Sequence, residues 1–359
     1  MPDAVPPPPP GPPPLPAARQ QPLIIQTRSR ATGWIITCVL LVMMLGLSLF
    51  FNLLGLIPKK KKARMDTIFQ ELIFAGETAS SNKIAVIDVD GVISKYAEGY
   101  TGRDGMVGDI KQQLKLAVED EEVKAIIVRI DSPGGEVLAS DELYNALLKA
   151  KIDKPNKPII VSMGSLAASG GYYVAVAGDW IIADDLTITG SIGVIMETVN
   201  YKGLMEKIGL QSYTFKSGKF KDLMNGSREP TPEEMALVQD LIMETYNKFV
   251  GIVATRRKMD VEALKHGLAD GRILSGTQAK VGGFVDELGD FDLAIRRAKE
   301  RAKISEARVF QYYVPFSFGR LFGFSAKSPL NKLSLSLSLD PNPLKLESGK
   351  LYYLSSHVF

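Results

Sequence analysis

The sequence predicts an α/β fold in which short buried strands alternate with helices. Apolar runs of strand length lie at 83–89, 124–130 and 158–162, and turn residues follow the second of them. Between these runs, the segments 108–119 and 136–151 carry apolar residues at helical spacing. This repeated change of period, from two residues to about 3.6, is typical of strands and helices in alternation.

Further elements continue the pattern. The strand at 158–162 leads into a small-residue segment at 164–173, and 179–183 is another short strand. A strong helical segment covers about 232–253 and has acidic residues in its first turn. Its start signals are Pro230, Thr231 and Pro232.

The composition allows one catalytic domain with appendages. The chain has 359 residues, 45% of them hydrophobic, which is enough to bury a sizeable core. The net charge of +3 is too small to indicate a nucleic-acid partner. The single cysteine, Cys38, lies in an apolar run and excludes a disulfide framework and a thiol metal site. Because the sequence contains no metal-ligand constellation and no phosphate-binding loop, we expect no cofactor.

Three pieces precede the predicted domain. Residues 1–31 are dominated by proline and are expected to be a disordered, extended tail. Residues 32–57 predict one transmembrane helix, because the 24 residues from Trp34 to Ile57 lack a charge and, at about 1.5 Å each, exceed the roughly 30 Å hydrocarbon core of a bilayer. No small-x-small site follows, which argues against a cleaved signal peptide. Residues 58–82 are expected to be a basic juxtamembrane linker with an amphipathic segment.

A cluster of hydroxyl and amine side chains predicts a serine hydrolase with a lysine base. Ser169 lies in the small-residue run, which lets a substrate approach its hydroxyl closely and leaves neighbouring amides free. The chain has only two histidines, and neither has an obvious partner carboxylate, which argues against a Ser-His-Asp triad. The structural alternatives are a packed glycine-rich turn and a solvated basic turn. The candidate lysines are Lys216, Lys219 and Lys221.

A lysine base requires a dry pocket. The pKa of an exposed lysine is about 10.4, and lowering it to about 7 to 8 corresponds to about 4 kcal/mol, which burial can supply. A second hydroxyl, such as that of Ser191, can orient the neutral amine toward Ser169. On an extended strand Lys219 and Lys221 point to the same face, so spacing alone does not choose between them.

The glycines after the strand at 124–130 predict an oxyanion hole. The segment Asp131–Gly135 ends a buried strand in a glycine turn, and amides at such strand ends face the crevice where ligands bind in open α/β sheets. Gly135 is therefore expected to supply one oxyanion donor and Gly170 the other. We assign structural roles to the nearby carboxylates, which are Asp131, Asp184 and Asp185.

Taken together, these motifs resemble the signal peptide peptidase A family of membrane-bound Ser-Lys proteases, from about residue 83 to about residue 290. The resemblance implies that Ser169 is the nucleophile, that Lys221 is the general base and that Ser191 orients the lysine. It also implies the oxyanion donors Gly135 and Gly170. The implied fold is a crotonase/Clp-protease-like repeated β-β-α superhelix, here with one N-terminal transmembrane helix.

The resemblance also divides the chain. It implies a Ser-Lys peptidase domain at 83–302, in which 271–289 is scaffold, followed by a C-terminal extension at 303–359. Within the extension, the segment 333–339 alternates apolar and polar residues with period two, as a half-buried strand does. This extension is expected to pack on a neighbouring subunit or to lie on a membrane surface.

The implied activity is that of a membrane-anchored serine endopeptidase that degrades remnant signal peptides or other apolar extended peptides. A substrate main chain is expected to pair beside Gly135 as an added strand. Longer relatives carry two copies of the domain with serine and lysine in different copies, so we expect a homo-oligomer in which Ser169 of one protomer meets Lys221 of another. The alternatives are a crotonase-fold acyl-thioester enzyme, a protease acting on membrane-organising proteins, and a non-catalytic crotonase-fold scaffold.

The orientation in the membrane rests on two opposed arguments. Three arginines precede the predicted membrane helix, and the run Lys59–Lys62 with Arg64 follows it, so the count of positive charges places the domain in the cytoplasm. The family resemblance implies a single-pass protein of the cell membrane with an extracytoplasmic catalytic domain. We adopt the second expectation, because the implied substrates remain at the outer face.

Overall fold

The computed structural model describes residues 30–55, 69–95, 105–315 and 351–354. The chain separates into two compact units, Met1–Asp66 and Thr67–Phe359. Helix α1, Arg30–Gly55, belongs to the first unit.

Several sequence predictions remain untested by the structure. None of the helices in the described ranges has both the length and the apolarity that a membrane crossing needs, so the transmembrane helix over 32–57 stays a prediction. The predictions for the proline-rich tail, for the lysine run at 59–62 and for the alternating segment at 333–339 lie outside the described residues.

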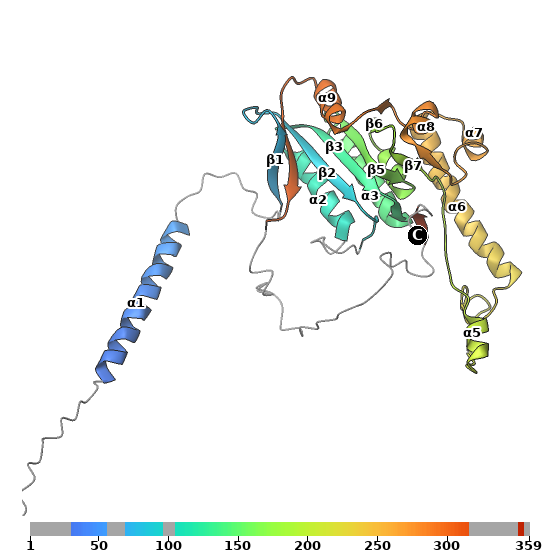
Figure 1. Cartoon of the computed structure of the whole chain (residues 1–359), viewed down its shortest axis with the longest axis horizontal. Coiled ribbons are helices and arrows are strands. Elements are labelled where there is room, and N and C mark those ends of the chain that lie inside the picture. The colour runs from blue at the N-terminus through green and yellow to red at the C-terminus, as the bar shows by residue number, and fades with distance from the viewer. Residues whose placement is uncertain (1–29, 56–68, 96–104, 316–350, 355–359) are drawn as a thin grey trace, which may run out of the picture. The chain divides into compact units, whose positions relative to one another are not determined.

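A largely parallel sheet forms the centre of the second unit (Figure 1). In its described part the sheet has nine strands in the order β1-β10-β2-β3-β5-β6-β9, and β7 pairs with both β5 and β8. Only β1 with β10 and β7 with β8 are antiparallel. The α/β class predicted from the alternating pattern is confirmed. The strands are β1 Gln70–Gly76, β2 Lys83–Asp90, β3 Val123–Ser132, β5 Ile159–Ala168, β6 Trp180–Ala183, β7 Ile188–Gly190, β8 Ile273–Ser275, β9 Glu287–Leu288 and β10 Arg308–Tyr313.

The middle strands are buried on both faces. In β2, Ala85 and Ile87 face one core, whereas Ile84 and Val86 face another, because successive side chains of a strand alternate. Helices α2, α3 and α4 cover the larger core, and α9 covers the smaller one on the opposite side of the sheet (Figure 1). Their bounds are α2 Gly105–Glu119, α3 Val137–Asp153, α4 Gly170–Ala175 and α9 Phe291–Ala302.

Strand β10 lies inside the sheet although the sequence pattern assigns 303–359 to an extension. It runs parallel to β2, with Phe310 opposite Ala85, and antiparallel to β1. Val309 and Phe310 are fully buried. Local periodicity does not reveal this pairing, because the partner strands lie far earlier in the sequence.

Helix α6, Pro232–Arg257, is anchored in the core at one end only. It begins with a capping box in which Thr231 and Glu234 satisfy each other's backbone amides. Its second half packs in the core through Phe249, Val250 and Val253. The helix continues away from the sheet (Figure 1), so its first turn lies about 22 Å along the axis from Phe249. Its outer half exposes Met235, Leu237, Leu241 and Met243.

Residues 196–231, which we call the arm, connect the sheet to the far end of α6 (Figure 1). The arm contains helix α5, Lys202–Lys207, and its two sides are joined by the amide of Tyr201, which donates to the carbonyl of Gly226 at 2.8 Å. Phe215 is 98% exposed. Other exposed apolar side chains of the arm are Val199, Tyr201, Leu204, Ile208, Leu210, Tyr213 and Leu223. The short helices α7 Val261–Lys265 and α8 Gly276–Val281 follow α6.

Replacing the anchor of α6 should destabilise the fold. Phe249→Ala removes a fully buried ring that contacts Tyr173 and Tyr353, and we expect the free energy of unfolding to fall by about 3–5 kcal/mol. Asn247→Ala, on the exposed face of the same helix, should change it by less than about 0.5 kcal/mol. Urea denaturation measures both, and equal effects of the two changes would contradict this role of Phe249.

Candidate active site

Ser169 sits at a sharp turn between β5 and α4. Its backbone has φ 53° and ψ −115°, a conformation that L residues rarely adopt and that costs about 1–3 kcal/mol. The turn is fixed because the Ser169 amide donates to the Gly190 carbonyl and the Tyr173 amide donates to the Ser169 carbonyl, both at 2.8 Å. The Ser169 side chain is buried, and its Oγ has no hydrogen-bond partner among the described residues. A desolvated hydroxyl without a partner is available for chemistry.

Ser191 lies beside Ser169 because two paired strands end together. In the parallel pairing of β5 with β7, Ala168 is opposite Gly190, so the next residue of each strand is a serine. Ser191 also has a positive φ of 50°, and its amide donates to the Arg272 carbonyl at 2.7 Å. The structure therefore brings together the two serines that the sequence singled out.

Gly135 and Gly170 also converge. Strand β4, Gly134–Glu136, follows β3, and a Cβ added to Gly170 would lie 3.1 Å from the Gly135 nitrogen. The Glu136 amide donates to the Ile93 carbonyl at 2.8 Å. Because successive residues of a strand face opposite neighbours, the Gly135 amide points away from Ile93, toward the next strand.

That next strand is β11, Tyr352–Leu354, which pairs antiparallel with β4 and places Tyr353 opposite Gly135. The Val137 amide donates to the Leu351 carbonyl at 3.2 Å. Hydrogen-bonded pairs recur at every second residue of an antiparallel ladder, so Gly135 and Tyr353 form the next such pair. This register directs the Gly135 amide toward the carbonyl of Tyr353.

The Tyr353 carbonyl also lies close to the Gly170 amide. A Cβ added to Gly134, whose φ is +103°, would lie 1.9 Å from the Tyr353 oxygen and 2.7 Å from the Gly170 nitrogen. Only glycine leaves this space open. The two glycines that the sequence assigned to an oxyanion hole therefore lie close to one carbonyl group, next to Ser169.

The opposite edge of β11 is paired as well. Ile195 and Tyr352 exchange two backbone hydrogen bonds, each of 3.1 Å. An extended segment thus fits between β4 and Ile195 with both of its edges satisfied, as expected for a peptide added as a strand. The sequence predicted such pairing beside Gly135, but it contained no signal that residues 352–354 occupy the position.

An aromatic pocket receives the Tyr353 side chain, which is fully buried. Its ring stacks on Tyr173 at 5.0 Å and lies 4.8 Å from Phe249. The hydroxyl donates to the Thr245 carbonyl at 3.3 Å. Burial raises the pKa of Tyr353, so the phenol remains a neutral donor. Tyr173 in turn donates to Asp141 at 2.5 Å, which ties the pocket to α3.

The three lysines of the cluster differ in their partners. Lys216 pairs with Asp222 at 2.6 Å, and Lys219 pairs with Glu233. The Lys221 amine has no hydrogen-bond or ion-pair partner in the described part of the chain. Lys221 is therefore the lysine of this cluster whose amine has no carboxylate partner among the described residues.

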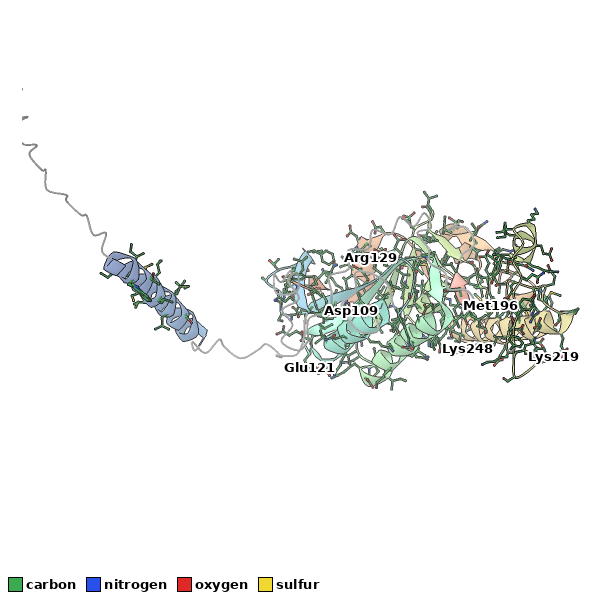
Figure 2. The ribbon with its side chains drawn as sticks, turned by 90° about the horizontal axis from the view of Figure 1, so that it is seen from below. Asp109, Glu121, Arg129, Met196, Lys219 and Lys248 are labelled. Atoms are coloured by element: carbon green, nitrogen blue, oxygen red, sulfur yellow. The ribbon has the colours of Figure 1, made fainter. Side chains whose placement is uncertain are left out.

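The structure does not bring Lys221 to Ser169 within one chain. Lys219 lies at the end of α6 farthest from the sheet, whereas Lys248 lies nearer to it (Figure 2). About 22 Å of helix separate the first turn of α6 from Phe249, whose ring is 4.9 Å from that of Tyr173. A lysine side chain is too short to cross this distance.

The carboxylates near the motifs have structural contacts. Asp131 accepts the Leu166 amide at 3.1 Å, and Asp184 accepts the Leu186 amide at 3.1 Å. Among the described residues no group of three or more His, Cys, Asp and Glu side chains could hold a metal ion.

Two family models match the region that carries this geometry. The model described as Clp protease matches residues 99–181, and the model described as Peptidase family S49 matches residues 151–305. The second range includes Ser169, Ser191 and Lys221. The fold, the site and these matches together place the protein in the class of serine proteases.

Individual relatives identify the family. A protein of Enterococcus faecium whose name assigns it to signal peptide peptidase SppA is 38% identical over 282 residues, which are 74% of this chain and 81% of that protein. The chloroplastic serine protease SPPA of Arabidopsis thaliana is 36% identical over 233 residues, 64% of this chain and 34% of its own length. Protease 4 of Salmonella typhi is 35% identical over 231 residues, with shares of 64% and 36%. The chain belongs to peptidase family S49.

The position of β11 generates a testable consequence. If a peptide substrate uses the slot between β4 and Ile195, then β11 competes with it. The apparent affinity for the peptide is then the intrinsic affinity multiplied by the fraction of molecules in which β11 has left the slot. We expect Tyr353→Ala to lower the KM for a short fluorogenic peptide several-fold, with kcat little changed. Tyr313→Ala, in β10 and partly exposed, is the control. An unchanged KM in the Tyr353 variant would contradict competition.

Proposed function

We propose that this protein is a serine endopeptidase in which Ser169 is the nucleophile and Lys221 is the general base. The proposal is carried by the convergence of the Gly135 and Gly170 amides on the carbonyl of a strand-bound tyrosine. A peptide carbonyl held by two backbone donors beside an unpaired hydroxyl is the arrangement that acyl transfer requires.

In the proposed reaction, Ser169 Oγ attacks the carbonyl carbon of the substrate and its proton passes to the lysine amine. Negative charge develops on the carbonyl oxygen, where the two glycine amides stabilise it. The peptide C–N bond then breaks, and the lysine returns the proton to the departing amine. The same lysine then deprotonates a water molecule, which attacks the acyl carbon; as the bond to Ser169 Oγ breaks, the lysine returns this proton to the serine oxygen.

The choice of Lys221 over Lys219 is supported by their partners. A general base must have an amine that is free to approach the nucleophile, and the Lys219 amine is engaged in an ion pair with Glu233. Lys216 is held in the same way by Asp222. Lys221 has no such carboxylate, and we infer that Ser191 orients its amine in the assembled site.

We propose that the dyad is shared between protomers of a homo-oligomer. The direction of α6 supports this, since the turn of Lys221 is bound to the end of α6 that lies far from the serine of its own chain. The exposed apolar side chains of the arm, of which Phe215 is the most exposed, offer a surface for a second copy. Contact with that copy also removes water from the amine, which favours its neutral form.

The proposed substrates are extended apolar peptides, including remnants of signal peptides. The slot between β4 and Ile195 pairs with main chain and therefore accepts extended segments. The aromatic walls of the Tyr353 pocket suit a large apolar or aromatic side chain before the cleaved bond. The name of the Enterococcus faecium relative is consistent with signal-peptide substrates.

We further propose that the protein is anchored in the cell membrane by a single helix and that its peptidase domain is extracytoplasmic. The uncharged run from Trp34 to Ile57 supports an anchor, and this run lies largely within the 26-residue helix α1. We also propose that the second unit is a Clp- and crotonase-like β-β-α superhelix, which the parallel pairing of β2, β3, β5 and β6 supports.

An active-site fluorophosphonate probe tests the nucleophile and the base together. We expect labelling of the wild-type protein, no labelling of Ser169→Ala, and labelling slowed at least about a hundredfold in Lys221→Ala. Lys219→Ala is the matched control and should be labelled nearly as fast as the wild type. Full labelling of Lys221→Ala, or no labelling of the wild type, would sink the proposal; the second result would favour a non-catalytic scaffold.

A further inference from the structure

An ion network in the arm surrounds the residue that follows Lys221. Asp222 receives two hydrogen bonds from the Arg228 guanidinium, from Nε and from Nη2, each of 2.8 Å. The same guanidinium donates from Nη1 to Glu234 at 2.8 Å. One arginine therefore clamps two carboxylates, one beside Lys221 and one in the first turn of α6.

We infer that Asp222, Arg228 and Glu234, which we call the clasp, are positioning residues that hold Lys221 for its role as the base. This inference rests on the proposed function of Lys221 and goes beyond it, since none of the three residues touches the reacting atoms. The clasp links the turn that carries the lysine to a rigid helix.

The contacts fix the backbone as well as the side chains. Arg228 Nη2 also donates to the Asp222 carbonyl at 3.1 Å, so the peptide next to Lys221 is bound directly. At the helix, the Glu234 carboxylate accepts the Thr231 amide at 2.8 Å, and the Thr231 hydroxyl accepts the Glu234 amide at 3.2 Å. Glu234 therefore belongs to the capping box and to the clasp together.

Burial makes the clasp stiffer than the other ion pairs of the arm. The side chains of Asp222 and Glu234 are only 8% and 3% exposed. Those of Lys219 and Glu233, which also pair across the arm and α6, are 63% and 56% exposed. An exposed pair contributes little to order, whereas a partly buried arginine that binds two nearly buried carboxylates restricts both partners.

The clasp is closed at neutral pH. Hydrogen bonds from Arg228 and then from Lys216 hold the pKa of Asp222 well below its usual range. Arg228, with the Thr231 amide, lowers the pKa of Glu234 to about 2. Both carboxylates are therefore ionised wherever a peptidase of this kind would work.

The turn around Lys221 needs such support. Its residues are held locally by short turns, in which the Lys221 amide donates to Gly218 at 3.2 Å and the Leu223 amide donates to Phe220 at 3.1 Å. The amine must nevertheless meet a serine of another chain. Misplacement of a catalytic group by about 1 Å costs on the order of a hundredfold in rate. Lysine cannot replace Arg228, because an ammonium lacks the planar fork that reaches two carboxylates.

The test uses the full-length protein with Arg228→Gln, and Asp222→Asn as a second variant of nearly unchanged shape. We expect each to lower kcat for a fluorogenic peptide at least about tenfold, with KM within about twofold of wild type, because the slot for the substrate is untouched. Glu233→Gln breaks the exposed pair between Lys219 of the arm and α6 and should retain wild-type kcat. Wild-type kcat in both clasp variants overturns the inference.

Mixing variants before assembly separates positioning from loss of fold. A clasp variant keeps an intact Ser169, and Ser169→Ala keeps an intact clasp and Lys221, so this mixture should regain activity. A clasp variant mixed with Lys221→Ala should not. The mixture of Ser169→Ala with Lys221→Ala tests the shared dyad by itself. If this mixture regains activity, but Ser169→Ala mixed with either clasp variant does not, the inference about the clasp is wrong and the shared dyad stands. If no mixture recovers, the shared dyad fails, and the inference fails with it.

Discussion

The direction of helix α6 is the constraint on which this site depends. Its second half is locked into the core, where the Phe249 ring lies 4.9 Å from that of Tyr173, four residues after Ser169. Its first turn is bound through Glu234 and Arg228 to the turn of Lys221. Because a capped helix of this length is stiff, its first turn, to which the turn of Lys221 is bound, stays about 22 Å along the axis from Phe249.

Two unsatisfied groups follow from that separation. The Ser169 hydroxyl is buried without a partner among the described residues, and the Lys221 amine is the one in its cluster to which the arm offers no carboxylate. The hydroxyl can donate a proton and the amine can accept one, so the two groups are complementary as acid and base. A second chain that brings them together would satisfy both and exclude water, which couples assembly to activity.

The sequence could predict what depends on local pattern and on short motifs. Alternating periodicity indicated β2, β3, β5 and α6, and the small-residue motifs placed Ser169, Ser191, Gly135 and Gly170 in a common region. Strands β10 and β11 could not be predicted, because each depends on pairing with residues more than two hundred positions earlier. The clasp was also missed, because nothing in the local pattern shows that folding brings Asp222, Arg228 and Glu234 together.

The shared site can be tested by linking its two halves covalently. In a Cys38→Ser background, the variant with Ser169→Cys and Lys221→Cys has two thiols, and a short bifunctional thiol reagent can join only neighbours. We expect denaturing electrophoresis to show dimers and higher multimers, with neither single-cysteine variant forming them. Efficient linkage within a single chain, leaving only monomers, would contradict the account, because it would show that α6 does not keep the lysine from its own serine.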